Sequence, residues 1–197
     1  MPQSRSPISS SPKKSLADPG WRLRAAGAAD ADALALVASA SFLETYAASL
    51  DGADLVAHCV TNNTREKFAA WASDPHTAVT LAEIVPGHAP LGYTVLTSVD
   101  LPVEPREGDI ELRRIYAMAR LHGTGVGPAM MAQALADAAR LGKTRLLLGV
   151  WGENHRAHRF YERQGFAVIG TRQFKVGSIV HDDLVYARVV STYTKSH

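Results

Sequence analysis

The chain alternates between two kinds of hydrophobic pattern. In some segments apolar residues recur every three or four positions, which is typical of a helix that covers a core, whereas short and nearly continuous apolar runs are typical of strands. The predicted helices are residues 30–46, with Asp30 as N-cap, 53–59, 64–73, 128–141 and a short helix from His155. The predicted strands are residues 21–25, 77–84, 91–99, 109–118, 145–151, 167–174 and 181–190.

Turn-forming residues separate these segments. The pair at 86–87, Pro-Gly, and the glycine at position 177 each lie between two predicted strands, so two hairpins are expected. Gly142 follows a predicted helix and is expected to end it. The strand 145–151 is too apolar to face water on either side, so we predict that it lies in the centre of a sheet.

The composition sets the domain organisation. The 197 residues are 46% apolar and 20% charged, and no internal repeat is visible, which is typical of a globular protein. Residues 1–20 are rich in Ser and Pro and have no apolar stretch of the kind that a secretion signal requires. We therefore predict a disordered tail at 1–20 and one domain at 21–197.

Charge and cysteine content limit the partners and the compartment. A formal net charge of +2 is too small to indicate a nucleic-acid partner. No apolar run has the length of a membrane span, so no membrane partner is expected. The single cysteine, Cys59, excludes a disulfide within the chain and fits a reducing cytoplasm. The sequence therefore predicts a cytoplasmic protein.

The most informative segment is the heptapeptide His-Gly-Thr-Gly-Val-Gly-Pro at 122–128, between a predicted strand and a predicted helix. Its three alternating glycines let the backbone turn tightly and approach a ligand closely. A helix that starts at Pro128 would direct its unpaired N–H groups and the positive end of its dipole at that ligand. A glycine loop followed by a helix start is a seat for an anion, usually a phosphate group.

Two common phosphate loops do not fit this segment. The dinucleotide-binding motif needs a third glycine three residues after the second, and those positions hold Pro128 or Met130. A nucleotide-triphosphate loop ends in Gly-Lys-Ser/Thr, and the segment contains no lysine. The pattern that remains is Gln/Arg-x-x-Gly-x-Gly, with His122 in the first position and Gly125 and Gly127 in the last two.

This pattern resembles the first motif of the GNAT superfamily of acetyl-CoA-dependent N-acetyltransferases. The segment 154–166 is similar to the second GNAT motif, Asn-x-x-Ala-x-x-Phe-Tyr-x-x-x-Gly-Phe, at every defined position. The two motifs occur in the family's order, and the resemblance covers residues 109–188. It implies an α+β fold with a mixed, mostly antiparallel sheet, with helices on both faces and a splay between the strands 110–118 and 145–151.

The resemblance also implies how the chain holds acetyl-CoA, which would be a co-substrate. The pantetheine arm is expected to lie in the splay and to pair with the first strand at Ile115, Tyr116, Ala117 and Met118. The diphosphate is expected on the amides of His122, Gly123, Thr124, Gly125, Val126 and Gly127. Asn154 is expected to cap the helix that follows it, to contact the cofactor, or both.

The acetyl transfer requires a base for the acceptor amine and an acid for the departing thiolate. Only the neutral amine attacks a thioester, and an alkyl amine with a pKa near 10.4 is about 3.4 units above neutral pH, which costs about 4.6 kcal/mol. Glu111 is the candidate base, because its position eleven residues before His122 resembles that of the base in the histone-acetylating branch. The alternative is a strand carboxylate paired with Arg113 or Arg114. Tyr161 lies where many GNAT enzymes place the general acid for the departing thiolate, and the alternative is a core tyrosine.

The acceptor is less closely defined. Four segments, 42–46, 111–116, 148–151 and 182–184, look like the PaiA branch, whose members acetylate polyamines. Substrate pockets of the family lie near the first helix, where Glu44, Asp51 and Asp54 could hold a polycation, Glu44 being the candidate ligand. Alternatively, these residues are solvated carboxylates near helix ends.

We therefore predict an enzyme that moves an acetyl group to a small-molecule primary amine, with a polyamine among the candidates, by direct attack in a ternary complex. The alternatives are an acetyltransferase of protein or peptide N-terminal amines and a non-catalytic sensor that binds CoA. A homodimer is a further candidate assembly. No metal is expected: His155 and His158 have a metal-compatible spacing, but no third ligand is visible. Cys59 beside His58 is expected to be a buried small residue.

Overall fold

The computed structural model describes residues 20–176 and 179–190. The predicted tail, except for Gly20, and the predicted turn residue Gly177 lie outside the described residues. The strands of the described part are β1 (Trp21–Ala25), β2 (Ala78–Ile84), β3 (Pro90–Thr97), β4 (Asp109–Ala117), β5 (Arg145–Trp151), β6 (Ala167–Val176) and β7 (Ile179–Val189).

These strands form one seven-stranded sheet in the order β1-β2-β3-β4-β5-β7-β6. All neighbours are antiparallel except β4 and β5, which are parallel. Both predicted hairpins, β2–β3 and β6–β7, are present, and β5 has a partner strand on each side, as predicted. The mixed, mostly antiparallel sheet of the predicted α+β fold is therefore confirmed.

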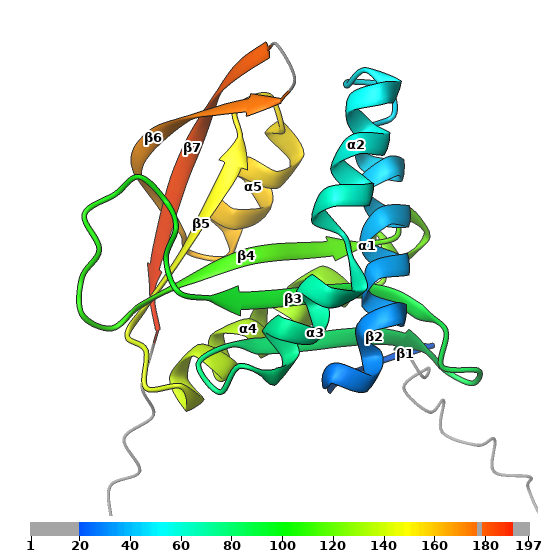
Figure 1. Cartoon of the computed structure of the whole chain (residues 1–197). Helices are drawn as coiled ribbons and strands as arrows, with labels where there is room; N and C mark the ends of the chain where they lie inside the picture. Colours follow the sequence, from blue (N-terminus) through cyan, green and yellow to red (C-terminus); the bar gives the residue numbers. More distant parts are fainter. Residues whose placement is uncertain (1–19, 177–178, 191–197) are drawn as a thin grey trace, which may run out of the picture.

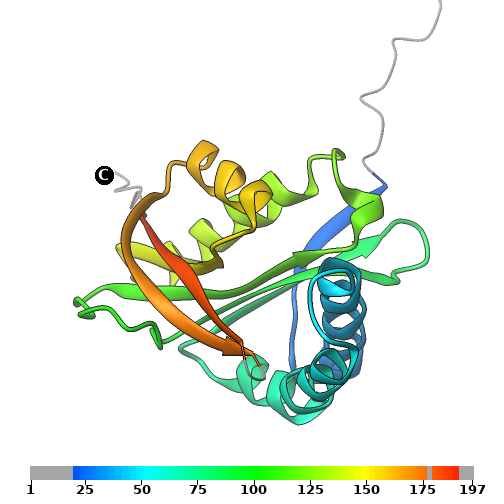
Figure 2. The same cartoon turned by 90° about the horizontal axis from the view of Figure 1, so that it is seen from above.

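Helices cover both faces of the sheet (Figures 1 and 2). They are α1 (Ala31–Tyr46), α2 (Gly52–Asn62), α3 (Arg65–Ser73), α4 (Val126–Arg140) and α5 (His155–Arg163). The first three lie over one face, which we call the α1 face, and α4 and α5 lie over the other, which we call the α4 face. Tyr93 and Val95 pack with α1 and α3, whereas Leu96 and Ile110 pack with α4, so β3 and β4 are buried on both faces.

A β-bulge interrupts the pairing of β3 with β4. Val95 pairs with Arg114 and the next residue pairs with Leu112, which leaves Arg113 as the extra residue. An extra residue reverses the alternation of side chains along a strand. Leu112 consequently packs on the α4 face, while Tyr116, four residues later, packs on the α1 face.

Side chains and glycines set the helix ends. Asp51, Thr64 and Asn154 each accept a hydrogen bond from a backbone N–H in the first turn of α2, α3 and α5 respectively, which satisfies a donor that the helix leaves unpaired. Gly142 ends α4 as predicted, with φ of 71°. The helix ends in a Schellman arrangement, because the N–H of residue 143 bonds to the carbonyl of Ala138.

Two predicted helix starts need correction. Asp30 precedes α1, but its carboxylate does not bond to an amide of that helix; it accepts from the N–H of Gly27 and binds Arg24 instead. Helix α4 begins at Val126, two residues earlier than predicted. The left-handed Gly125, with φ of 87°, turns the chain into the helix early, so Pro128 is its third residue and not its first.

A partly buried ion pair joins the first residues of β4 and β5, where the two strands are paired. The Arg145 guanidinium donates to both Asp109 carboxylate oxygens at 2.7 and 2.6 Å. Burial alone would raise the pKa of Asp109, but hydrogen bonds from Arg145 and from the N–H of Arg106 lower it below its ordinary value overall.

Asp109→Ala should lower the free energy of unfolding by about 2–4 kcal/mol, because it leaves a partly buried guanidinium uncompensated. Chemical denaturation measures this loss. Because the folded-state pKa of Asp109 is depressed, the stability that the pair contributes is present above about pH 4 and is lost as pH falls below it. Asp100→Ala is the control: this carboxylate is exposed, and its loss should cost less than about 1 kcal/mol. Equal losses in the two variants would contradict the assignment.

Candidate active site

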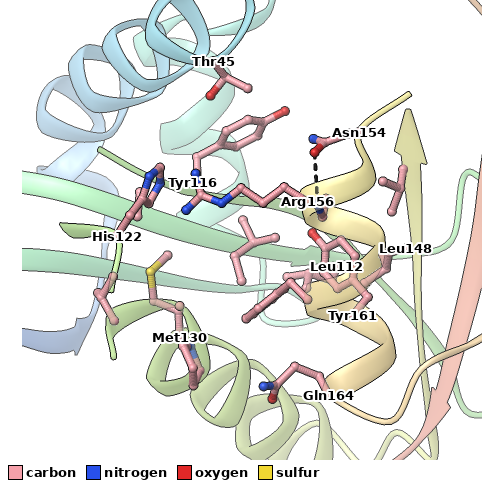
Figure 3. Close-up of a pocket in the computed structure, with 18 of the residues that line it drawn as sticks. Thr45, Leu112, Tyr116, His122, Met130, Leu148, Asn154, Arg156, Tyr161 and Gln164 are labelled. Atoms are coloured by element: carbon pink, nitrogen blue, oxygen red, sulfur yellow. Dashed lines mark hydrogen bonds between the residues drawn. The ribbon is translucent and has the colours of Figure 1, made fainter. Parts of the chain in front are cut away.

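A cleft opens where β4 and β5 separate. The two strands pair only through Asp109–Glu111 and Arg145–Leu147, and beyond these residues they diverge. The cleft between them has a volume of about 590 Å³, which is typical of small-molecule sites. Residues of β4, β5, α4, α5 and the glycine loop line it, and Thr45 and Tyr46 at the end of α1 close it from the other face (Figure 3).

The edge of β4 that faces β5 presents to this cleft peptide groups that β5 does not pair. The N–H of Met118 bonds to Leu91 on the β3 side. Because alternate residues of a strand direct their peptide groups to the same edge, Ile115 and Ala117 direct theirs to the edge that faces β5. Both residues line the cleft, so an extended ligand can pair with them as an added strand would.

The glycine loop presents four more N–H groups. Gly123 and Gly125 have φ of 82° and 87°, values that favour glycine. The amides of His122 and Thr124 already bond to carbonyls of the preceding turn. Among the described residues, no hydrogen bond uses the N–H of Gly123, Gly125, Val126 or Gly127. Of the six amides that were predicted to bind a diphosphate, these four therefore have an N–H that is not already bonded within the described structure.

Basic side chains of α5 border the same loop. Arg156 extends across the mouth of the cleft toward His122 (Figure 3), and Arg163 also lines the cleft. Burial and the charge of Arg156 lower the pKa of His122, so His122 is neutral at neutral pH. The positive charge beside the free amides therefore comes from the arginines and from the α4 dipole.

Asn154 serves as the N-cap of α5 and also reaches the cleft. Its Oδ1 accepts a hydrogen bond from the Ala157 N–H at 3.0 Å, and the residue lines the cleft (Figure 3). The capping role is confirmed, and the contact with a cofactor remains a prediction.

Tyr161 lines the cleft between the two strands (Figure 3). The residue is 8% exposed and packs edge-on against Phe160 and Phe166. Among the described residues, no hydrogen bond engages its hydroxyl. Burial, with a smaller contribution from Tyr116, raises the pKa of Tyr161 above its ordinary value. The side chain is thus a neutral hydroxyl at the cleft and not a phenolate.

Glu111 lies beside the cleft and does not line it. It is 5% exposed, its Oε2 accepts from the Asp100 N–H at 2.8 Å, and the same oxygen is 3.6 Å from Arg113 Nη1. Burial raises the pKa of Glu111, and the Asp100 N–H, Arg113 and Arg172 oppose the rise. It is therefore a buried carboxylate with a raised pKa next to Arg113, which does line the cleft.

The three predicted acceptor carboxylates do not come together at the cleft. Glu44 joins α1 to the start of the glycine loop, since its Oε2 accepts from the Ala119 N–H at 2.6 Å, and it lines a neighbouring cavity of about 420 Å³. Asp51 caps α2, and Asp54 lies in the first turn of that helix.

The comparison with protein families decides the class. A model of the acetyltransferase (GNAT) family matches residues 45–166, more than half of the chain. The chain belongs to the GNAT family. Uncharacterised N-acetyltransferases of Mycobacterium bovis and Mycobacterium tuberculosis are each 35% identical to this GNAT chain over 159 residues, which cover 81% of it and 97% of theirs.

Solved GNAT structures share the fold. The PaiA N-acetyltransferase of Thermoplasma acidophilum, in complex with coenzyme A, has a TM-score of 0.69 at 19% identity and covers 86% of this chain and 98% of its own. The yncA protein of Salmonella typhimurium, with its cofactor acetyl-CoA, has a TM-score of 0.61 at 17% identity and covers 90% and 98%. Likeness at these identities shows the fold alone; the family match and the relatives at 35% identity are what make the chain a GNAT N-acetyltransferase.

Several lining residues of this GNAT cleft were not predicted from the sequence. They are Thr45, Tyr46, Leu112, Arg113, Met130, Leu148–Trp151, Arg156, Phe160 and Gln164. Tyr46 and Trp151 illustrate the reason: their rings lie 6.0 Å apart, but they come from elements more than a hundred residues apart. For Arg156, a signal did exist, since it lies within the second motif.

The remaining candidates have structural explanations. The ring nitrogens of His158 lie 2.9 Å from the Tyr186 hydroxyl and 2.9 Å from the Gly152 carbonyl oxygen, so neither is available to a metal. Within the described ranges, no three His, Cys, Asp or Glu side chains gather as a metal site would require. Cys59 is partly buried rather than fully buried. Of the helices that the structure describes, none combines the length and hydropathy of a membrane span.

Proposed function

We propose that this GNAT enzyme moves the acetyl group of acetyl-CoA to the primary amine of a small molecule, by direct attack of the amine in a ternary complex. The observation that carries the proposal is the cleft between β4 and β5, which reaches both α4 and α5 on one face and the end of α1 on the other. A cofactor can therefore enter from the α4 face, and an acceptor can meet it from the α1 face.

The residues present fit acetyl-CoA. The four free amides of the glycine loop bind the diphosphate, and the positive end of α4 favours its charge. Ile115 and Ala117 pair with the pantetheine amides along the edge of β4, and Asn154 and Arg156 hold the arm from α5. When bound, acetyl-CoA supplies a thioester carbonyl as the electrophile.

Glu111 is the base in this proposal. Its carboxylate takes a proton from the acceptor ammonium through water, because Glu111 does not itself line the cleft, whereas Leu112 and Arg113 do. Because the pKa of Glu111 is raised, it is closer to the pKa of the amine that Glu111 must deprotonate. Desolvation of the ammonium in the aromatic end of the cleft, formed by Tyr46, Tyr116 and Trp151, lowers the amine pKa in the same direction.

Glu111→Gln should lower kcat at pH 7 by about 100-fold or more and leave the rate above the amine pKa nearly unchanged, because there the amine needs no base. A pH–rate profile with acetyl-CoA saturating measures both effects. The free energy of unfolding should not fall, since a raised folded-state pKa means that the ionised carboxylate destabilises the fold at neutral pH.

The control for this variant is Glu107→Gln, which removes an exposed carboxylate before β4 and should change neither rate nor stability. Equal rates of Glu111→Gln and the parent at pH 7 would remove the base role.

The acceptor class is tested by the release of free CoA thiol with spermidine, a lysine peptide, aminoglycosides and amino acids. The proposal expects turnover with at least one small-molecule amine. Turnover with the peptide alone would favour a protein or peptide N-acetyltransferase, and tight CoA binding without turnover would favour a sensor. A polyamine is the acceptor that the PaiA resemblance implies, although the Glu44 carboxylate expected to bind it already holds the Ala119 amide.

A further inference from the structure

A group of nitrogen donors, which we call the donor cluster, lies on the α1 face beside the cleft. It consists of Arg114 on β4, Lys67 on α3, and His58 and Asn63 at the end of α2. In Figure 1 the junction of α2 and α3 lies in front of β4. Lys67 Nζ lies 5.7 Å and the Arg114 guanidinium 5.8 Å from the centre of the Trp71 ring, so the two cations share one aromatic surface.

Neither cation has an acidic partner. Arg114 donates to Asn63 Oδ1 at 2.9 Å, and Lys67 donates to Asn62 Oδ1 at 3.1 Å. Among residues 20–176 and 179–190, no carboxylate oxygen lies within 4.0 Å of either cation. Asp100 and Glu111 face Arg113 instead, and Asp183 faces Arg172.

The electrostatic surroundings of the donor cluster are uniformly positive. Burial lowers the pKa of Lys67, and Arg114 and Arg113 lower it further. Burial, Arg114 and Lys67 lower the pKa of His58 to about 4. No acidic group counteracts these shifts in either case, which is unusual for partly buried cations.

Two further donors of the donor cluster have no hydrogen-bond partner in the described structure. Asn63 is 5% exposed, and its Nδ2 has no hydrogen-bond partner in the described structure. Its orientation is fixed, because Oδ1 must face the Arg114 donor. The His58 Nε2 is likewise buried without a described partner, and it carries the ring proton if Asn62 Nδ2, 3.4 Å away, donates to Nδ1.

Arg114 and Lys67 are partly buried and meet only neutral acceptors, while Asn63 Nδ2 and His58 Nε2 are buried and have no acceptor among the described residues, although buried donors normally have one. The donor cluster adjoins the cleft without lining it: the Phe42 ring stacks on His58 at 4.0 Å and lies 6.5 Å from the ring of Tyr116, which does line the cleft. The bulge at Arg113 is what turns Arg114 and Tyr116 to the same face.

We propose that the acceptor amine also carries an anionic group, a carboxylate or a phosphonate, and that Arg114, Lys67 and Asn63 bind that group. This inference rests on the proposed function, since it names the class of amine that the enzyme acetylates. Two cations beside the cleft repel a polyamine and attract an amine with an acidic end. The acidic end also positions the amine: held at the donor cluster, it leaves the amine to reach the aromatic end of the cleft.

The test compares matched pairs of amines. In each pair one amine carries the anionic group, and in its masked partner a neutral group replaces it. Common L-amino acids are compared with their carboxamides, and 2-aminoethylphosphonate is compared with ethanolamine. Spermidine is the polycation. Masking the carboxylate lowers the basicity of the α-amine, so more of it is neutral at pH 7, and a preference for the acid cannot come from amine protonation.

We expect kcat/KM for at least one acidic amine to exceed that for its masked partner and for spermidine by about tenfold or more. If only the amino acids show this preference, the site binds a carboxylate; if only 2-aminoethylphosphonate shows it, the site binds a phosphonate. Arg114→Gln and Lys67→Gln should each reduce this ratio to near one, mainly by raising KM for the acidic acceptor, with KM for acetyl-CoA unchanged. Arg65→Gln, on the exposed side of α3, should leave the ratio as it is.

Equal kcat/KM within every pair, a preference for spermidine, or an unchanged ratio in both cluster variants would each overturn the inference. Calorimetry with the CoA-loaded protein separates it from the proposed function. If an acidic amine gives a heat of binding and its masked partner does not, and if Lys67→Gln abolishes that heat, the anion site is supported even without turnover. If amines without an acidic group are acetylated and no acidic amine gives such heat, the acetyltransferase activity is supported and the anion site is overturned.

Discussion

Gly127→Asp is expected to raise the dissociation constant for coenzyme A by about 100-fold or more while the fold stays intact. Gly127 is the second residue of α4, and its N–H is one of the four free amides in the glycine loop. An aspartate there would place a carboxylate where we propose that the diphosphate binds, and like charges at close range cost several kcal/mol.

The fold should tolerate this change. A Cβ at Gly127 would meet only the Phe160 ring, at 3.5 Å, which is ordinary contact, and its φ lies outside the left-handed region. An acidic residue in the first turn of a helix is favourable because it complements the helix dipole. The melting temperature should therefore stay the same or rise.

Calorimetry with CoA and thermal unfolding measure the two effects on the same sample. The matched control is Gly127→Asn, which has nearly the same volume without the charge and should weaken CoA binding by less than about tenfold. If Gly127→Asp bound CoA as tightly as Gly127→Asn, the diphosphate would have to lie elsewhere and the cofactor site would be misplaced.

The parts of this site that are local in the chain could be predicted from the sequence. The glycine loop and the segment 154–166 each form one continuous stretch, and a strand–loop–helix unit holds its own amides in place whatever surrounds it. Element order and the central position of β5 followed from hydrophobic patterning. The start of α4 was misjudged because Pro128 is favourable at a helix start, whereas the left-handed Gly125 in fact begins the helix.

The acceptor side could not be predicted, because it depends on contacts between distant segments. The bulge at Arg113 has no sequence signal, yet it determines that Arg114 and Tyr116 share the α1 face. Regular alternation would have placed both with Leu112 on the α4 face. Similarly, nothing local indicated that Glu44 would hold the Ala119 amide, 75 residues away in sequence. Charge counts along the chain do not reveal which charges lack partners in space.

Tyr161→Phe is expected to lower kcat by about 10²- to 10³-fold, the range for loss of one hydrogen-bond donor to a developing negative charge. The substitution removes one hydroxyl and keeps the ring that packs on Phe160 and Phe166. KM for acetyl-CoA should change little, because the interaction with the sulfur strengthens only as negative charge develops there. Pre-steady-state release of thiol, with the cofactor saturating, measures the chemical step directly.

The pKa of Tyr161 defines what this hydroxyl can do. Burial raises that pKa, so the proton stays on oxygen through neutral and mildly alkaline pH. Full transfer to a thiolate with a pKa of about 8.5 is then uphill, and the hydroxyl stabilises the departing sulfur by donating a hydrogen bond. The parent enzyme should accordingly show no loss of kcat from ionisation of Tyr161 up to about pH 10. Tyr161→Phe should be slower by the same factor at every pH.

Tyr186→Phe provides the control that separates chemistry from packing. Tyr186 is a buried neighbour whose ring centre lies 6.2 Å from that of Tyr161, and its hydroxyl lies 2.9 Å from His158 Nδ1, but it does not line the cleft. Removing that hydroxyl should cost about 1 kcal/mol of stability and leave kcat within a few fold. Tyr161→Phe should show the opposite pattern, a large loss of kcat with little loss of stability. Unchanged kcat in Tyr161→Phe would make it a core residue, and the thiolate would then have to be stabilised by the cleft backbone alone.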